Sequence, residues 1–254
     1  MSTWVLLRGL ARESRHWGGF APALRQQLPP GHTVCTVDLP GTGALWRERS
    51  PDTVAGLVQA ARRELARMPH QGPCLLVALS LGGMVAREWA AQDPHAVRGC
   101  VLINTSLGGL APFWQRLRPA SYPALLGLLR PRQTALRREQ AILRLTSNLP
   151  VSDAVAAAWA GYAASAPVAR NNVLIQLAAA ARYRADTRAP AVPTLLLASC
   201  RDRLVSVECS RRIAQAWGVP LRVHPDAGHD LPLDDPTWVV AEITRWYALG
   251  AEPR

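Results

Sequence analysis

The sequence of 254 residues contains no lysine, so all 29 of its basic side chains are arginine. The formal net charge is +11 at pH 7, which by itself would suit a protein that binds nucleic acid. However, the chain contains no recognisable nucleic-acid-binding motif and no interleaving of aromatic and basic residues. We therefore expect no nucleic-acid partner.

Long apolar runs and paired cysteines are missing as well. No stretch of about 18 apolar residues occurs, so we expect no membrane-spanning helix and no stable membrane insertion. The opening MSTWVLLRGLARES has an apolar run too short for a signal peptide, and no basic stretch precedes that run. The cysteines form no C-x-x-C pair and no zinc-ligand spacing, which predicts buried thiols in a reducing, cytoplasmic compartment. They are Cys35, Cys74, Cys100, Cys200 and Cys209.

Short apolar runs alternate with helical patterns in the first 107 residues and again after residue 190. Helical periodicity follows Ser50-Pro51-Asp52, which we interpret as an N-cap, and a last helix is expected after Asp235-Pro236. This alternation predicts an α/β fold with a mostly parallel sheet of about six strands and helices on both faces. The expected strands are Trp4–Leu7, Thr33–Val37, Cys74–Ala78, Arg98–Ile103, Thr194–Ala198 and Leu221–Val223.

Residues 108–189 have a different character, because strand patterns stop and alanine, leucine and arginine dominate. This segment holds 11 arginines against three acidic residues, a net charge of +8, whereas the rest of the chain carries +3. We interpret it as a helical cap inserted into a core of residues 1–107 and 190–254. The cap would cover the carboxyl ends of the strands, where open α/β sheets bind their ligands.

Ser80 stands between the third expected strand and the helix that follows, in the string ALSLGG (Ala78–Gly83). A nucleophilic side chain at this place must be lifted clear of the sheet on a sharp turn. Small residues two positions before and after it let strand and helix approach closely. The alternative is a serine that only caps the helix.

A serine nucleophile needs a general base and an acid that orients the base. Asp202 follows the fifth expected strand in LLLASCRDRLV, and His229 precedes the last helix in HPDAGHDLPLDDP. Their order and context make Ser80, Asp202 and His229 the candidate triad. Taken singly, Asp202 could be a solvated aspartate beside Arg201 or Arg203, and His229 a surface histidine.

The competing side chains fit these roles less well. Asp230 directly follows His229, and we interpret it as solvating the loop or bonding locally. His224 lies at a strand end, five residues too early for the base. The remaining histidines lie in linking segments and are expected at the surface; they are His16, His32, His70 and His95.

The motifs together resemble those of the α/β-hydrolase superfamily, and are closest to small bacterial carboxylesterases such as the pimeloyl-carrier-protein methyl ester esterases. The strings that carry the resemblance are LLRG, DLPGTG, ALSLGG, SCRDRLV and AGHD, and it covers residues 3–107 and 190–250. It implies a serine hydrolase that cleaves an ester or thioester through an acyl-enzyme, without a metal or organic cofactor.

The resemblance also implies an oxyanion hole made of backbone N–H groups. One donor would be Leu81, directly after the nucleophile at a helix N-terminus. The loop after the first strand resembles the family's His-Gly loop, with Arg8 in place of the histidine and Gly9 retained. The second donor would then be the N–H of Leu10.

The basic cap suggests an anionic substrate or an acidic acyl-carrier protein as partner, because arginine pairs with carboxylate and phosphate. The candidate binding residues are Arg130, Arg137 and Arg138. The alternative is that they lie on solvated helix faces. Apolar residues of the cap, Phe113 and Trp114 among them, are expected to line or cover an acyl pocket.

Two other functions stay open at this point. Arginines together with Trp and Leu suit an enzyme that works at an anionic membrane surface. A catalytically silent binding protein with the same fold is the main alternative to an enzyme.

Overall fold

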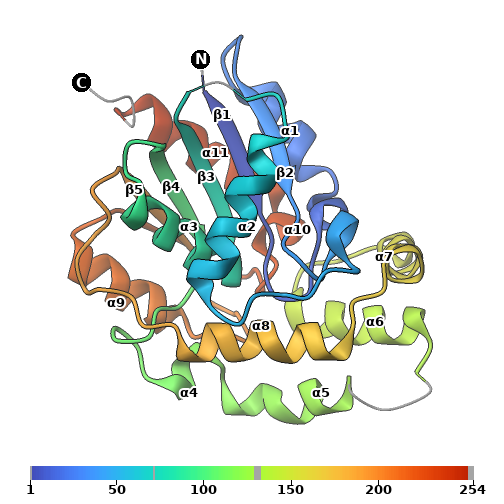
Figure 1. Ribbon diagram of the computed structural model, residues 1–254. Coiled ribbons are helices and arrows are strands. Elements are labelled where there is room, and N and C mark those ends of the chain that lie inside the picture. The colour runs from blue at the N-terminus through green and yellow to red at the C-terminus, as the bar shows by residue number, and fades with distance from the viewer. Residues whose placement is uncertain (1, 71, 129–132, 251–254) are drawn as a thin grey trace.

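The computed structural model describes residues 2–70, 72–128 and 133–250 (Figure 1). Its sheet has six strands in the order β2-β1-β3-β4-β5-β6, and every neighbouring pair is parallel. The predicted α/β fold with a parallel sheet of about six strands is therefore confirmed. The strands are β1 (Thr3–Leu7), β2 (Thr33–Val37), β3 (Cys74–Leu79), β4 (Val97–Ile103), β5 (Thr194–Ser199) and β6 (Leu221–His224).

Helices cover both faces of this sheet, as Figure 1 shows for α2 and α3 in front and α1 and α11 behind. The helices of the core are α1 (Phe20–Gln27), α2 (Val54–Ala66), α3 (Leu81–Gln92), α9 (Val207–Trp217), the short α10 (Leu231–Asp234) and α11 (Pro236–Ala248). Two 3-10 turns, η1 (Ser14–Trp17) and η2 (Gly43–Leu45), lie in the loops that follow β1 and β2.

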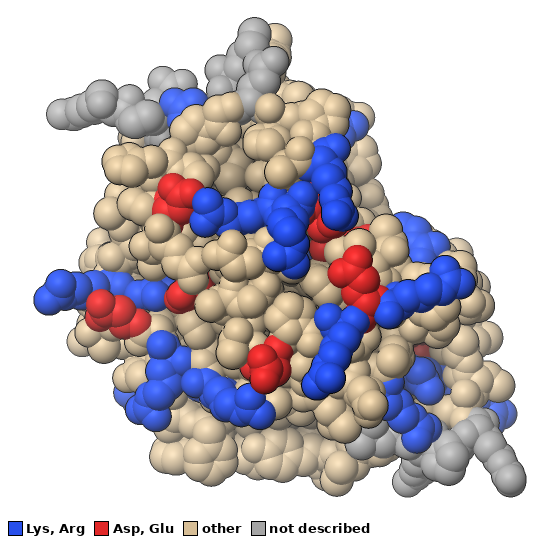
Figure 2. All heavy atoms as spheres, viewed as in Figure 1, with Lys and Arg blue, Asp and Glu red and all other residues tan. Residues whose placement is uncertain are grey.

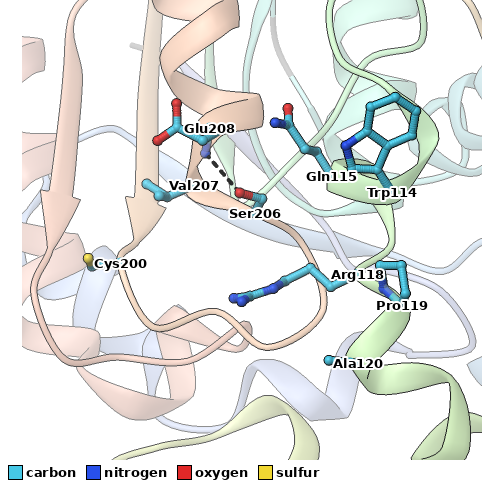
Figure 3. Close-up of a pocket in the computed structure, with 9 residues that line it drawn as sticks. All are labelled: Trp114, Gln115, Arg118, Pro119, Ala120, Cys200, Ser206, Val207 and Glu208. Atoms are coloured by element: carbon cyan, nitrogen blue, oxygen red, sulfur yellow. Dashed lines mark hydrogen bonds between the residues drawn. The ribbon is translucent and has the colours of Figure 1, made fainter.

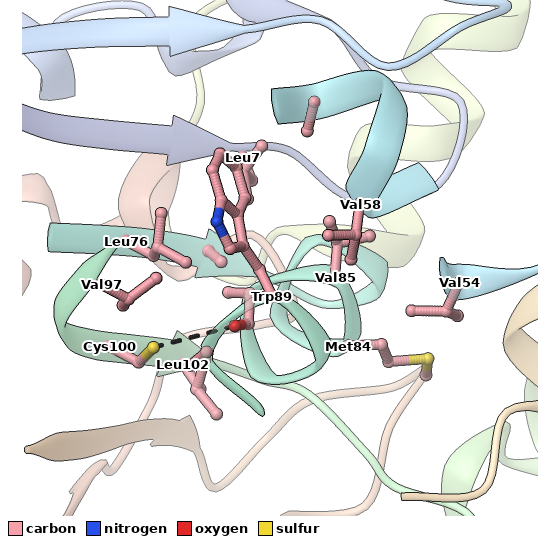
Figure 4. Packing of buried hydrophobic residues seen from close by; sticks show 14 of the residues in the cluster. Leu7, Val54, Val58, Leu76, Met84, Val85, Trp89, Val97, Cys100 and Leu102 are labelled. Atoms are coloured by element: carbon pink, nitrogen blue, oxygen red, sulfur yellow. Dashed lines mark hydrogen bonds between the residues drawn. The ribbon is translucent and has the colours of Figure 1, made fainter. Parts of the chain in front are cut away.

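Successive side chains of each strand enter two different cores, as the two-residue period of a strand requires. In β1, Val5 and Leu7 join α2, α3 and α9 in one cluster, while Trp4 and Leu6 join α1 and α11 in the other. Figure 4 shows the first cluster, where Trp89 of α3 packs among strand side chains. Each fully buried Leu or Val stabilises the fold by about 1.5–3 kcal/mol, so both faces of the sheet depend on their helices.

Helix α2 begins later than the sequence pattern indicates. Its N-cap is Thr53, whose side chain accepts a hydrogen bond from the N–H of Gly56 at 3.1 Å. The predicted cap at Ser50 is therefore wrong. Ser50 is buried, and its N–H donates instead to Asn172 from another part of the chain. Asp235 caps α11 as expected, by accepting from the N–H of Trp238 at 2.9 Å.

The described residues between β4 and β5 form helices and no strand of the sheet, and they lie beyond one end of it (Figure 1). The two ends of this segment meet, because the N–H of Ala185 donates to the carbonyl of Gly108 at 3.1 Å. The elements are α4 (Phe113–Arg116), η3 (Pro119–Ser121), α5 (Tyr122–Gly127), α6 (Ala135–Thr146), α7 (Asp153–Ser165) and α8 (Arg170–Arg182). Within the described ranges, no helix combines the length and the apolar character needed to cross a membrane.

Candidate active site

Ser80 forms a sharp turn between β3 and α3, with φ of 57° and ψ of −117°. A residue other than glycine in such a conformation stores about 1–3 kcal/mol of strain and needs its surroundings to hold it. The N–H of Ser80 donates to Ile103 of β4 at 2.9 Å, and its carbonyl accepts from the Thr105 hydroxyl at 2.8 Å. Both partners belong to β4 or the residues just after it, so the neighbouring strand maintains the turn.

The backbone passes this turn closely at two glycines, and the crowding is severe at Gly82 and milder at Gly9. A Cβ on Gly82 would lie 2.4 Å from the carbonyl oxygen of Leu7. A Cβ on Gly9 would lie 3.2 Å from Cβ of Ser80 and 3.7 Å from its hydroxyl oxygen. The loop after β1 therefore runs directly along the serine, as the expected oxyanion loop would.

Asp202 and His229, 27 residues apart, meet in a buried hydrogen bond. Nδ1 of His229 lies 2.7 Å from Oδ2 of Asp202, and the side chain of Asp202 is 1% exposed. The other carboxylate oxygen accepts from the N–H groups of Leu204 and Val205. Both oxygens are thus fixed, and Asp202 is not the solvated loop aspartate of the alternative interpretation.

The pKa of His229 is raised above its ordinary value, although burial of the imidazole acts in the opposite direction. Burial is the largest single influence, and the charge and then the hydrogen bond of the Asp202 carboxylate act against it. Asp230 raises the pKa further, whereas the Arg8 guanidinium lowers it. A carboxylate on Nδ1 holds the histidine in one tautomer and leaves Nε2 for other chemistry.

Ser80 and His229 lie at the same edge of the sheet without a hydrogen bond between their side chains in the described structure. Asn104, directly after the Ile103 that binds Ser80, donates from its side chain to the carbonyl of His229 at 2.9 Å. The adjacent residues Ile103 and Asn104, at the end of β4, therefore bind the backbones of Ser80 and His229. A nucleophile–base hydrogen bond is often long before substrate binds, so the pairing of Ser80 with His229 stays a prediction.

Sequence reasoning missed the role of Asn104. Its Nδ2 also contacts Ser199 at the end of β5 and the carbonyl of Gly228, and its Oδ1 accepts from the N–H of Ser199. The sequence signal was present, because Asn104 directly follows a strand on the predicted ligand-binding edge. Asn104 has a φ of 44° and is 2% exposed, so a buried amide joins two strand ends to the histidine loop.

The two predicted oxyanion donors occupy suitable places. Leu81 is the first residue of α3, where the helix dipole favours a negative charge. Leu10 follows Gly9 in the loop beside Ser80. No acceptor within the described residues receives the backbone N–H of Leu10 or of Leu81.

Arg8 and Asp230 form a buried ion pair beside these residues, which corrects the interpretation of Asp230 as a loop-solvating side chain. The two guanidinium nitrogens lie 3.0 and 2.6 Å from the two carboxylate oxygens. The side chains are 3% and 5% exposed. No local pattern predicts this contact, because 222 residues separate the partners.

His16 is buried, although its place in a linking segment predicted a surface residue. Trp159 and Tyr162 of α7 cover its ring, with centroids 4.7 and 5.6 Å away. Burial and then the charges of Arg12 and Arg8 lower the pKa of His16, so it is neutral. His224 binds the N–H groups of Asp226 and Ala227, which is a structural role in the turn after β6.

The helices after β4 contact this edge at several points. The carbonyl of Thr146, the last residue of α6, accepts from the N–H of Asp230 at 2.8 Å. Glu139 of α6 pairs with Arg12 at 2.7 Å, and Gln176 of α8 accepts from the N–H of Ala11 at 2.9 Å. The loop after β1 is therefore held by helices that lie far from it in the sequence.

Two of the three predicted binding arginines are neighbours near the start of α6. Arg137 is exposed and Arg138 half-buried near the start of α6, while Arg130 lies outside the described residues. At 1.5 Å per residue, Arg137 stands about 13 Å along the helix from the Thr146 carbonyl that contacts the histidine loop. On the face in Figure 2, the arginines lie in several separate groups with acidic side chains among them.

The hollow in Figure 3 has a volume of about 430 Å³ and opens beside the loop of Asp202. Trp114, Arg118 and Glu208 are among its lining residues, and the three candidate triad residues are not. Arg118 donates to the carbonyl of Asp202 at 2.7 Å. The hollow therefore lies next to the candidate triad and is not lined by it. Trp114 lines this hollow and is 53% exposed, while Phe113 is 69% exposed, so their place at an acyl pocket stays a prediction.

A parallel sheet with a serine on the turn after its central β3 strand, and an Asp–His pair after β5 and β6, is the arrangement of an α/β hydrolase. The model of the alpha/beta hydrolase family matches residues 4–242, and the chain belongs to this family. The predicted superfamily and the predicted hydrolase class are thereby confirmed.

Among the relatives, a protein of Variovorax paradoxus named as a candidate carbamate hydrolase, RutD, is 29% identical over 245 residues. The match covers 89% of this chain and 84% of that one. A pimeloyl-[acyl-carrier protein] methyl ester esterase of Chromobacterium violaceum is 37% identical over 91 residues, 35% of this chain and 33% of the relative. Two longer relatives are matched over only 17% and 18% of their length.

The solved structure of a hydrolase from Pseudomonas aeruginosa PA01 superimposes with a TM-score of 0.76. The match covers 98% of this chain and 90% of that one, at 21% identity. A match at this identity shows that the two proteins share a fold. It gives no information about the substrate of this chain.

Proposed function

We propose that this chain is a serine hydrolase that cleaves a carboxylic ester or thioester through an acyl-enzyme intermediate. The observation that carries the proposal is the buried 2.7 Å hydrogen bond between Asp202 and His229, at the edge where Ser80 occupies its strained turn. A carboxylate that fixes Nδ1 leaves Nε2 free to act as a base. Ser80, His229 and Asp202 are then nucleophile, general base and orienting acid.

In the proposed reaction, Nε2 of His229 takes the hydroxyl proton of Ser80 while the oxygen attacks the substrate carbonyl carbon. The N–H groups of Leu10 and Leu81 bind the oxyanion, and Asp202 stabilises the imidazolium. The imidazolium gives its proton to the departing alcohol or thiol. His229 then deprotonates a water molecule, which attacks the acyl-enzyme and releases the acid and Ser80.

The proposal includes residues 108–189 as a cap over a core of residues 1–107 and 190–254. Contacts of α6 and α8 with the loop after β1 support it. So does the bond between the Gly108 carbonyl and the Ala185 N–H, which closes the segment at its base. Cytoplasmic placement is also part of the proposal, because all five cysteines are free thiols.

The acyl group would be linked to an acidic carrier protein. The cap has an excess of arginine, and four relatives that bear the name of pimeloyl-[acyl-carrier protein] methyl ester esterases are 37–39% identical over 91–99 residues. Arg137 and Arg138 lie about 12–13 Å along α6 from the histidine loop. That separation lets a carrier sit on the cap while its acyl arm reaches Ser80.

Turnover of p-nitrophenyl butyrate tests the reaction. We expect hydrolysis by the native chain, labelling of Ser80 by a fluorophosphonate, and loss of both in Ser80→Ala. Ser106→Ala, at a buried serine just after β4, is the matched control and keeps both activities. A native chain with neither turnover nor labelling would favour the catalytically silent binding protein.

Salt dependence tests the carrier. The KM for a carrier-linked acyl ester should rise with ionic strength, and the KM for neutral p-nitrophenyl butyrate should not. Replacing Arg137 and Arg138 by glutamine should raise the KM for the carrier-linked ester and leave the KM for p-nitrophenyl butyrate unchanged. Arg63→Gln, at an exposed arginine of α2, is the control. Equal effects of salt on both substrates would reject a carrier and leave a small ester as the substrate.

A further inference from the structure

Arg8 connects three parts of the active-site edge. Its carbonyl oxygen would lie 2.7 Å from a Cβ on Gly82, so its backbone packs against the turn that carries Ser80. Its side chain reaches Asp230, the residue after His229. The next residue, Gly9, borders Ser80 and precedes the proposed donor Leu10.

The backbone and side chain of Asp230 are also fixed by hydrogen bonds. Its N–H donates to Thr146 of α6, and its carbonyl accepts from the N–H groups of Leu233 and Asp234. Both carboxylate oxygens bind the Arg8 guanidinium, which also lies 5.0 Å from the centre of the Trp17 ring. Neither side chain can change its position without displacing a neighbouring loop.

Stability alone does not account for such a pair. Two charges at 3% and 5% exposure lose most of their hydration, and a well-packed apolar pair of similar volume is often as stable or more stable. What an ion pair with two parallel hydrogen bonds adds is a fixed geometry. Here that geometry joins the loop of the proposed oxyanion donor to the loop of the proposed base.

We propose that Arg8 and Asp230 are positioning residues, whose buried ion pair holds the Gly9–Leu10 backbone and the His229 imidazole in a fixed relation to Ser80. This inference rests on the proposed function, because it assigns the pair to the same reaction. Neither residue touches the reacting atoms. The pair acts through the two loops, and through the opposite charges that it places beside the imidazole.

The charged groups around His229 make this role measurable. Asp202, Asp230 and Arg8 act on its charge, and Asp234 binds the N–H of the preceding Gly228. Farther from the imidazole, Arg12 pairs with Glu139, Arg118 binds the carbonyl of Asp202, and buried His16 is neutral. The side chains of Ser80, Asn104, Thr146 and Asn148 are uncharged. Removing either member of the pair therefore changes the electrostatic environment of the base in a known direction.

The test measures the rate of Ser80 labelling by a fluorophosphonate as a function of pH in folded Asp230→Asn and Arg8→Gln variants. Asp230→Asn removes a negative charge and leaves the arginine unopposed, so the midpoint of labelling moves to lower pH. Arg8→Gln removes the positive charge, so the midpoint moves to higher pH. In both, the plateau rate falls at least about tenfold, since a misplaced donor or base slows attack.

A matched control separates positioning from general loosening. Arg87 is as buried as Arg8, at 5% exposure, and binds the carbonyls of Asp186 and Arg188 away from the serine. Arg87→Gln should lose thermal stability and keep the native midpoint. Folded single variants that lack either the opposite midpoint shifts or the tenfold loss would overturn the proposal.

If the single variants do not fold, the double variant Arg8→Gln/Asp230→Asn decides. Two neutral amides can replace the ion pair without leaving an unpaired charge. We expect this variant to fold and to label at least about tenfold more slowly at its plateau. Labelling at the native rate would overturn the positioning role. A native chain that is not labelled at all would instead refute the proposed function.

Discussion

Single residues at this edge are held in conformations that they would not adopt alone. Ser80 and Asn104 both have positive φ, 57° and 44°; the end of β4 binds the backbone of Ser80, and the end of β5 binds Asn104. Strain of this kind persists only where the surroundings determine it, and it is concentrated at functional sites. Gly82 is part of those surroundings, because its missing side chain lets α3 start directly against the end of β1.

Gly82→Ala should destabilise the chain by about 1–3 kcal/mol, because the added methyl meets the backbone carbonyls of Leu7 and Arg8, which cannot rotate away. The turn of Ser80 would shift with α3, so labelling by a fluorophosphonate should slow as well. Denaturant unfolding measures the first effect. Gly161→Ala on α7 is the control, because nothing lies within 4 Å of its added methyl. A Gly82→Ala variant as stable as the native chain would contradict the close contact between α3 and the carbonyls of Leu7 and Arg8.

The pH dependence of ester turnover should reflect the raised pKa of His229. The base is active when neutral, so kcat/KM should rise with pH through an apparent pKa above the usual histidine value of about 6.5. Asp202→Asn removes the charge and hydrogen bond that raise this pKa, leaving burial to lower it. The acidic limb should then move to lower pH, while the plateau falls by about 10⁴-fold.

The matched control for that prediction is Asp226→Asn, at a half-exposed aspartate that lies in the loop of His229 and pairs with Arg201. This substitution should change neither the pH of the acidic limb nor the plateau value of kcat/KM. An acidic limb that stays at the native pH in Asp202→Asn would show that another group is the base.

Elements with a clear local pattern could be predicted from the sequence, and contacts between distant segments could not. The predicted limits of Thr33–Val37 agree with β2, and the other five strands were placed within about one residue. The start of α2 was misplaced because Ser50 and Pro51 have the composition of a cap. The N–H of Ser50 binds α8 instead, and Thr53 caps the helix. His16 was misplaced because α7, 143 residues away, covers it.

The candidate site divides in the same way. Ser80, Asp202 and His229 stand at strand ends, where topology alone brings them to one edge, and their roles stay a prediction until activity is measured. The Arg8–Asp230 pair depends on two loops meeting, and no periodicity reports that contact. Helix α8 packs Ala180 against the core and also reaches it through two buried amides, Asn172 and Gln176, whose type does not mark them in the sequence.

Asn172 offers a test of that contact between α8 and the core. It is 6% exposed, accepts from the N–H of Ser50 at 3.0 Å and donates to the carbonyl of Glu48 at 2.9 Å. Asn172→Leu leaves a buried N–H without a partner, which should cost about 1–3 kcal/mol. Hydrogen exchange of α8 should become faster. Asn171→Leu, at the exposed neighbour, should change neither stability nor exchange. Native exchange rates in Asn172→Leu would show that α8 is held by other contacts.

At the scale of the whole molecule, the core on the α2 and α3 side of the sheet contains Cys74 and Cys100 and packs against Cys35, while Cys209 lies in a small separate cluster. Burial raises the pKa of Cys35 to about 11 and those of Cys74 and Cys209 to about 12, and it raises the pKa of fully buried Cys100 as well. Cys200, at the end of β5, is exposed. Thiolates are the reactive form, so a buried thiol with a raised pKa reacts slowly while the fold is intact.

Titration with Ellman's reagent at pH 8 should therefore find one fast thiol in the native chain and all five after unfolding in guanidinium chloride. Cys200→Ser should remove the fast phase and leave four thiols in the unfolded chain. The slow phase then measures opening of the cores, because each remaining thiol reacts only when its cluster opens. Gly82→Ala, which strains the cluster containing Cys74 and Cys100, should speed that phase, and Gly161→Ala should not. A second fast thiol in the native chain would contradict the packing around the other four cysteines.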